Sequence, residues 1–82
     1  MVRLLYFGKL ADVSGQAEES LKLPADAMDS ASLRQWLDTR FGARGDMLEP
    51  TVRIAVDGEI VIDPYDLSGA REIALMPPVG GG

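Results

Sequence analysis

The chain has 82 residues, of which 46% are hydrophobic and 26% are charged, and its formal net charge is −5. It contains no cysteine and no histidine, which excludes disulfides, thiolate nucleophiles, cysteine-based metal sites and histidine acid–base catalysis. The acidic balance repels nucleic acid and anionic membranes and favours a basic protein partner. No apolar run approaches the roughly 20 residues of a membrane span, so we expect one small cytoplasmic domain with a protein–protein role.

Two strands are predicted in the first part of the chain. Residues 2–7, VRLLYF, are β-branched, aliphatic and aromatic, which is typical of a strand. Alternation places Tyr6 on one face and Phe7 on the other, so we expect cover over both faces at the end of this strand. Residues 8–16 read as a connection with one helical turn, and residues 18–23 as a second strand.

One long helix follows, in the segment SASLRQWLDTRFG. Its apolar residues Leu33, Trp36, Leu37 and Phe41 recur at i, i+3, i+4 and i+8, which is the stripe of an amphipathic helix. The helical spacing predicts that Trp36 and Phe41 are core residues rather than a stacking site for a base or cofactor.

A hairpin and a last strand complete the chain. The segments VRIAV and EIVI flank Asp57-Gly58, a strong hairpin signal, and the last strand, EIALMP, is stopped by Pro77-Pro78. The order β-β-α-β-β-β predicts an α+β fold with a mixed sheet of about five strands packed on one main helix. Since one helix covers only one face of a sheet, the other face meets solvent or a partner.

Two acidic pairs are candidates for acid–base or metal chemistry. Neighbouring residues such as Glu18 and Glu19 point in opposite directions on a strand, and neither they nor Asp63 and Asp66 have an evident third ligand. We therefore expect these carboxylates to be a solvated surface.

The last seven residues, MPPVGGG, carry the strongest functional signal. We expect one folded domain in residues 1–77 and a flexible glycine-rich tail in residues 78–82, with a frayed end as the alternative. Five residues from Pro78 reach roughly 16–18 Å when extended. Because glycine has no Cβ, such an arm can enter a narrow channel and leaves the carboxylate of Gly82 unhindered. The residues predicted to insert into a partner are Pro77, Pro78, Val79, Gly80 and Gly81.

Chemistry at this tail requires activation of its carboxylate. Conversion to an acyl-adenylate with ATP supplies a good leaving group, after which a sulfur donor produces a thiocarboxylate. A docked domain that holds this sulfur in a partner's pocket makes its attack effectively intramolecular. The catalytic side chains that the chain lacks would then come from its partners.

The residues resemble a known family, the small subunits of molybdopterin synthase, which are MoaD-type sulfur carriers with the ubiquitin-like β-grasp fold. VRLLYFGKLADVSG is similar to the family's opening strand and turn, SLRQWL to its helix, VRIAVDG to its hairpin, and MPPVGGG to its terminal P-P-V-x-G-G. Asp57, where the family often has Asn, and SGARE, in place of the frequent Gly-Asp-Glu, are departures in turns.

The resemblance implies that Gly82 is the catalytic group. It would be adenylated by a MoeB-like E1-type enzyme with ATP, thiocarboxylated, and would then give sulfur to cyclic pyranopterin monophosphate to form molybdopterin. The chain would be an enzyme only as the sulfur-donating subunit, with no bound cofactor or metal. It would work in a heterotetramer of two plus two with a MoaE-like large subunit. Strand parity offers Phe7, Ile60 or Val61, and Met76 as an apolar interface beside the arm, with second-face core as the alternative.

Three other functions fit the same sequence. A thiamine-pathway sulfur carrier shares the fold and the glycine end. A ubiquitin-like protein modifier would form an isopeptide bond through Gly82. A non-catalytic β-grasp interaction domain would use its sheet and never its carboxylate.

Overall fold

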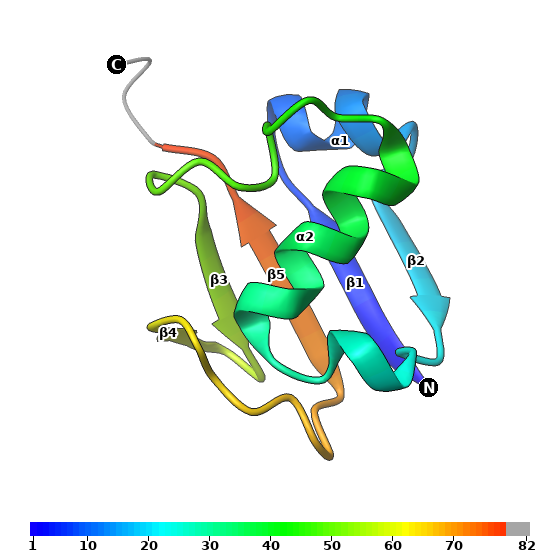
Figure 1. Ribbon diagram of the computed structural model, residues 1–82, viewed down its shortest axis with the longest axis vertical. Coiled ribbons are helices and arrows are strands. Elements are labelled where there is room, and N and C mark those ends of the chain that lie inside the picture. The colour runs from blue at the N-terminus through cyan, green and yellow to red at the C-terminus, as the bar shows by residue number, and fades with distance from the viewer. Residues whose placement is uncertain (79–82) are drawn as a thin grey trace.

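The computed structural model describes residues 1–78, in which a five-stranded sheet is crossed by one long helix (Figure 1). The elements in chain order are β1 (Val2–Tyr6), α1 (Lys9–Ser14), β2 (Glu18–Leu21), a 3₁₀ turn η1 (Ala25–Ala27), α2 (Ser30–Phe41), β3 (Arg53–Val56), β4 (Glu59–Val61) and β5 (Glu72–Met76). The predicted order of strands and long helix is confirmed, and α1 is the helical turn expected after the first strand. The η1 turn was not predicted.

The sheet is mixed, with the strand order β2-β1-β5-β3-β4. The inner neighbours β1 and β5 are parallel, and every other neighbouring pair is antiparallel. The last strand of the chain therefore lies in the middle of the sheet, between the first strand and the hairpin. Pro77, which follows β5, is therefore reached from an inner strand of the sheet rather than from an edge strand.

The core lies between the sheet and α2, which crosses one sheet face diagonally (Figure 1). Leu33 and Leu37 of the helix are fully buried, as are Leu4, Ile54 and Leu75 of the central strands. Burying a side chain of this size stabilises the fold by roughly 1.5–3 kcal/mol relative to leaving it exposed. The predicted helix stripe is thus confirmed at its leucines, whereas Trp36 and Phe41 are only partly buried at the margin of the core.

Side chains and backbone conformation fix both ends of α2. Asp29 accepts a hydrogen bond from the backbone N–H of Ser32 at 2.8 Å, which satisfies one of the free donors of the first turn. Gly42 takes the left-handed conformation with φ of 61°, and its N–H bonds back to the last turn. The helix is therefore held at a defined length over the sheet.

The β3–β4 hairpin turns through Asp57 and Gly58, whose φ angles of 50° and 90° fit the two-residue turn predicted from the sequence. Asp57 Oδ1 accepts hydrogen bonds from the backbone N–H groups of Arg71 and Glu72, both at 3.0 Å. The turn is thereby attached to the start of β5. An asparagine Oδ1 would accept the same two bonds, so the departure from the family's usual residue leaves this link in place.

Within residues 1–78, α2 is the longest helix, and none of the helices there is long and apolar enough to cross a membrane.

Candidate functional site: the open sheet face and the tail exit

The tail leaves the sheet at Pro77, next to the loop that joins β1 to α1. A Cβ built on Gly8 would lie 2.8 Å from Pro77 Cγ, so this loop backs directly onto the proline. Gly8 has φ of 54°, a conformation that favours glycine. Of the predicted insertion residues, Pro77 and Pro78 are described, and Pro78 is exposed.

The remaining predicted tail residues, Val79, Gly80, Gly81 and Gly82, lie outside the described part of the chain. The structural site is therefore the surface from which the tail departs.

We use the term open face for the side of the sheet that α2 does not cover. A cross-strand row runs over it from Leu5 on β1 through Ala74 on β5 and Ala55 on β3 to Ile60 on β4. Because the two alanine side chains are small, the surface is lower between the larger side chains of Leu5 and Ile60. A surface of this shape can receive an apolar side chain from another protein.

The predicted interface residues Phe7, Ile60 and Met76 all lie on the open face beside the tail exit, and we call these three the docking patch. Phe7 and Met76 each follow one residue after the paired Tyr6 and Leu75, and Phe7 is 48% exposed. Nothing within residues 1–78 covers Phe7 fully, so the cover expected at this end of the first strand would have to come from another molecule.

At 63% exposure Ile60 is the most exposed member of the docking patch, while Met76 is half-buried. The alternative candidate Val61 pairs with Ile54 and packs against the core instead. Alternation along β4 makes this distinction, because neighbouring strand residues point to opposite faces. Ile62, which is 86% exposed at the end of the same hairpin, was not singled out from the sequence.

A hollow of about 330 Å³ opens at the tail exit. Its lining residues are Thr51, Arg53, Ile60, Met76, Pro77 and Pro78. Sequence reasoning missed Thr51 and Arg53. For Arg53 a signal existed, because alternation along VRIAV places it on the same face as Ala55.

The opposite end of the open face is charged. Arg3 on β1 and Glu72 on β5 are register partners, and their side chains form an ion pair at 2.7 Å. The pair is well exposed, so it contributes little to stability. Its position gives the open face an apolar half near the tail and a polar half away from it, which is the division between centre and rim found in protein interfaces.

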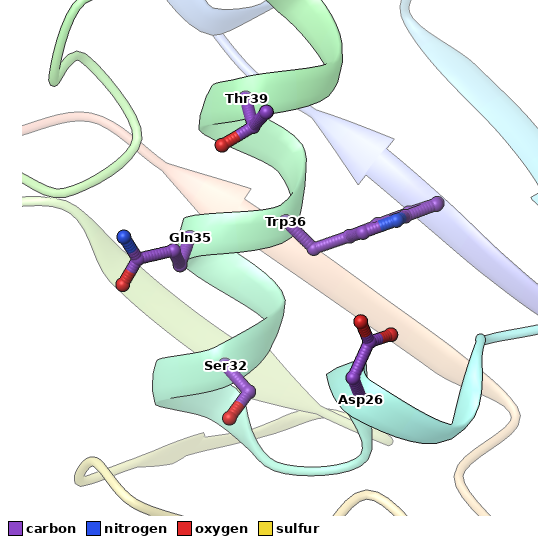
Figure 2. Close-up of a pocket in the computed structure, with 5 residues that line it drawn as sticks. All are labelled: Asp26, Ser32, Gln35, Trp36 and Thr39. Atoms are coloured by element: carbon purple, nitrogen blue, oxygen red, sulfur yellow. The ribbon is translucent and has the colours of Figure 1, made fainter.

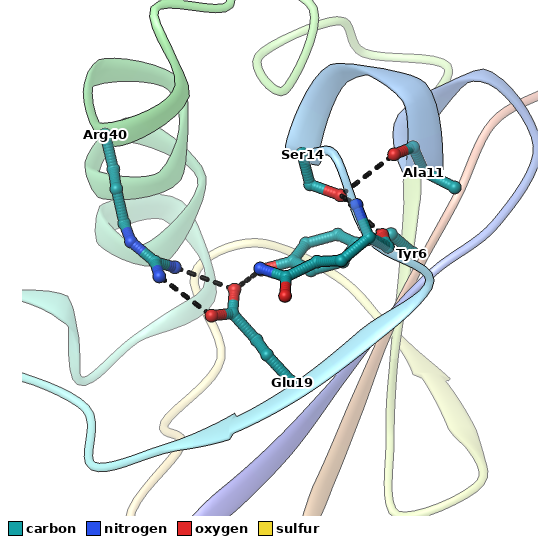
Figure 3. A network of polar contacts seen from close by, with 6 residues as sticks. Tyr6, Ala11, Ser14, Glu19 and Arg40 are labelled. Carbon is teal, nitrogen blue, oxygen red and sulfur yellow. Dashed lines mark hydrogen bonds and ion pairs between the residues drawn. The ribbon is translucent and has the colours of Figure 1, made fainter.

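On the other side of the sheet, Glu19 joins three elements (Figure 3). Its carboxylate receives two hydrogen bonds from Arg40 on α2, at 2.7 and 2.8 Å, and one from the Tyr6 hydroxyl on β1 at 2.5 Å. The expectation that Glu19 is solvated is therefore wrong. Strand alternation does not reveal this structural role of Glu19, because its partners Tyr6 and Arg40 are distant in sequence.

The electrostatics of this network suit a structural role. The hydrogen bonds from Arg40 hold the pKa of the Glu19 carboxyl below its usual value, with a smaller contribution from the Tyr6 hydroxyl. Burial, reinforced by the bond to Glu19, raises the pKa of Tyr6 far above its usual value. Tyr6 is thus a permanent donor. The guanidinium of Arg40 also lies over Trp36 and Phe41, with its carbon 5.3 and 4.9 Å from the ring centroids, so these partly buried rings contact a cation as well as the core.

The second acidic pair is also structural. Asp63 forms an ion pair at 2.7 Å with Arg34, a residue that is largely buried on α2. Asp66 accepts hydrogen bonds from the backbone N–H and hydroxyl of Ser68 in the loop before β5, and these bonds lower the pKa of its carboxyl. Both carboxylates are exposed, as expected from the sequence, and Asp63 in addition neutralises the charge of Arg34.

A second hollow, also of about 330 Å³, lies on the outer side of α2 (Figure 2). Its lining residues are Asp26, Ser32, Gln35, Trp36 and Thr39. It includes none of the predicted site residues and only one titratable group, so it offers no acid–base pair. The tail exit remains the better candidate site.

The fold and the apolar surface at the tail exit define a class of protein, the ubiquitin-like β-grasp proteins. SAMP1 from Haloferax volcanii, a small archaeal modifier protein, has the same fold with a TM-score of 0.76, over 99% of this chain and 98% of that chain. Its sequence identity to this chain is 20%, so the similarity concerns the fold alone.

Within this class, the chain belongs to the ThiS family, whose model matches residues 4–82. A protein of Mycosarcoma maydis named molybdopterin synthase sulfur carrier subunit is 34% identical, over 99% of this chain and 92% of its own length. The protein of the same name from Caenorhabditis briggsae is 32% identical, over 99% of this chain and 96% of its own length. The resemblance seen in the sequence is therefore confirmed.

Proposed function

We propose that this chain is the sulfur carrier subunit of a molybdopterin synthase and that Gly82 carries the sulfur as a thiocarboxylate. The observation that supports this function best is the exit of Pro77 from the middle of the sheet, next to an uncovered apolar patch. Family similarity that extends through residue 82 supports the role of the tail itself.

The first step activates the terminal carboxylate. A MoeB-like E1-type enzyme joins the Gly82 carboxylate to the AMP portion of ATP and releases pyrophosphate. A sulfur donor then displaces AMP and leaves a thiocarboxylate. ATP belongs to the activating enzyme, and this chain needs no bound cofactor.

The second step delivers the sulfur. In a complex with a MoaE-like large subunit, two copies of each, the tail enters a pocket of that subunit. The thiocarboxylate sulfur attacks cyclic pyranopterin monophosphate, and hydrolysis of the acyl–sulfur bond returns the carboxylate of Gly82. The chain thus takes part in a sulfurtransferase reaction, in the cytoplasm, as the carrier of the nucleophile while the large subunit supplies the catalytic side chains.

In this proposal the docking patch contributes affinity for the large subunit and orients the tail toward its pocket. Ile60 and Met76 line the hollow at the tail exit, and Phe7 directly precedes Gly8, which lies against Pro77. Covering these residues with the large subunit therefore fixes the direction in which Pro78 leaves. Holding the sulfur beside its target in this way replaces a bimolecular encounter with an intramolecular one.

The test is reconstitution of molybdopterin formation with purified partners and a set of tail variants. Deletion of Gly82, or addition of one alanine after it, is expected to abolish sulfur transfer. The melting temperature and the affinity for the large subunit should stay close to wild type, because the core of residues 1–78 is untouched. Molybdopterin formation by either variant would show that the carboxylate of Gly82 is not the carrier.

A further inference from the structure

Arg53 is a charged residue at the tail exit that takes no part in core packing. It lies on the open face as the register partner of Met76, and it lines the same hollow as Ile60, Pro77 and Pro78. It is exposed, so its position is not a consequence of core packing.

The charge of Arg53 has no ion-pair partner within residues 1–78. Arg3, Arg34 and Arg40 each have a carboxylate oxygen at 2.7 Å. Arg44 and Arg71 have no such partner in that part of the chain either, but of these three unpaired arginines only Arg53 lines the hollow at the tail exit. On the open face Arg3 is neutralised by Glu72, at the end away from the tail. Arg53 therefore presents a free guanidinium among apolar side chains.

A docked partner would remove water from this guanidinium. An unpaired charge under an interface is strongly unfavourable, whereas a carboxylate that receives two parallel N–H bonds offsets the lost hydration. Arg53 also places a positive charge at the tail exit of a chain whose net charge is −5. It therefore favours a surface with an acidic group at one defined point and disfavours a basic or purely apolar one.

We propose that Arg53 selects the large subunit by pairing with a carboxylate on the rim of the pocket that receives the tail. This inference rests on the proposed function. The large subunit is the occupant because the curated relatives are named as subunits, and a desolvated ion pair beside apolar side chains suits an interface that remains closed. We expect this carboxylate of the large subunit to lie next to the apolar side chains of that subunit that cover Met76 and Ile60.

The test compares charge changes at two arginines. The Arg53→Glu and Arg53→Gln variants alter the proposed contact, and Arg71→Glu makes the same change in net charge as Arg53→Glu but outside the hollow. Arg71 is exposed just before β5, and only its backbone N–H contacts Asp57. Melting temperatures should be unchanged in all three variants.

The readout is the dissociation constant for the purified large subunit, measured by calorimetry at several salt concentrations. We expect Arg53→Glu to weaken binding by about 30-fold or more and Arg53→Gln by about 10-fold, as for loss of one partner of a desolvated pair. Arg71→Glu should remain within about threefold, because an exposed charge outside the contact acts only through screened attraction. A scan of acidic residues on the pocket rim, each changed to Arg, should find one that restores binding of Arg53→Glu.

The other possible results separate the role of Arg53 from the proposed function of the chain. Equal binding by Arg53→Glu and Arg71→Glu would show that Arg53 does not select the partner and would leave the proposed function intact. If Arg53→Glu binds more weakly and no acidic-to-Arg change on the pocket rim restores its affinity, the proposed pairing with a carboxylate is contradicted. Impaired adenylation with normal large-subunit binding would assign Arg53 to the activating enzyme instead. No binding by the wild-type chain would overturn the proposed function together with this inference.

Discussion

Asp57 accepts a hydrogen bond from the backbone N–H of Glu72 at 3.0 Å, which joins the β3–β4 turn to the first residue of β5. The same Oδ1 also accepts from the N–H of Arg71. Because β5 leads into the tail, this one side chain connects the hairpin that bears Ile60 to the strand that aims Pro77.

The Asp57→Asn variant should keep its free energy of unfolding within about 0.5 kcal/mol of wild type, since the amide oxygen accepts both bonds and Asn tolerates positive φ. Asp57→Ala should lose about 2 kcal/mol, because two backbone donors lose their partner and alanine is strained at a φ of 50°. Urea denaturation measures both. Equal destabilisation by Asn and Ala would show that the negative charge, rather than acceptor geometry, holds the turn.

The pH dependence of stability should depend on Glu19. The folded state lowers the pKa of this carboxyl below the ordinary value of 4.5, so folding favours the ionised form. The unfolded chain then binds more protons in acid, and the stabilisation is present above pH 4.5 and is lost as pH falls through the lower, folded pKa. Unfolding free energies measured between neutral and acidic pH should decline over this range.

The Glu19→Gln variant is the matched control, because it keeps the shape of the side chain but has no carboxyl to titrate. It should be less stable than wild type at neutral pH, by about 2 kcal/mol as for hydrogen bonds to a charged group, and the difference should shrink in acid. A wild-type minus variant difference that stays constant from neutral to acidic pH would contradict the assigned ion pair.

The docking patch should be necessary for partner binding and dispensable for folding. Ile60→Asp should weaken binding to the large subunit by about 30-fold or more, since an unpaired charge would be buried within the contact. The melting temperature should change little, because Ile60 is 63% exposed. The matched control is Tyr65→Asp, at an exposed apolar residue in the loop before β5 and outside the open face. Equal affinities for the two variants would place the interface elsewhere.

Much of the fold was predictable because its signals are local. Asp57-Gly58 marks a turn by its own backbone preferences, and the leucines of α2 mark the buried helix face by their spacing. Strand ends were less predictable, since pairing decides them. For example, β2 was expected through residue 23 but ends at Leu21, whose register partner is Val2 at the start of β1.

The site was predictable in outline only. Parity offered Phe7 and either Ile60 or Val61 for one face, and a sequence does not show whether a second layer covers that face. The roles of Glu19 and Arg53 depend on which charges meet in space. Glu19 meets Arg40 only after α2 packs on the sheet, whereas Arg53 meets no carboxylate within residues 1–78. Pairing of charges is a property of the folded chain, and composition reports only their number.

The most direct test of the central claim is the intact mass of the chain after incubation with an E1-type activating enzyme, ATP and a sulfur source. We predict a mass increase that corresponds to one oxygen replaced by sulfur, located at Gly82 by fragmentation, and no such increase when ATP is omitted or Gly82 is deleted. A conjugate to the lysine of another protein would identify a modifier instead. An unchanged mass under full activation conditions would contradict sulfur carriage.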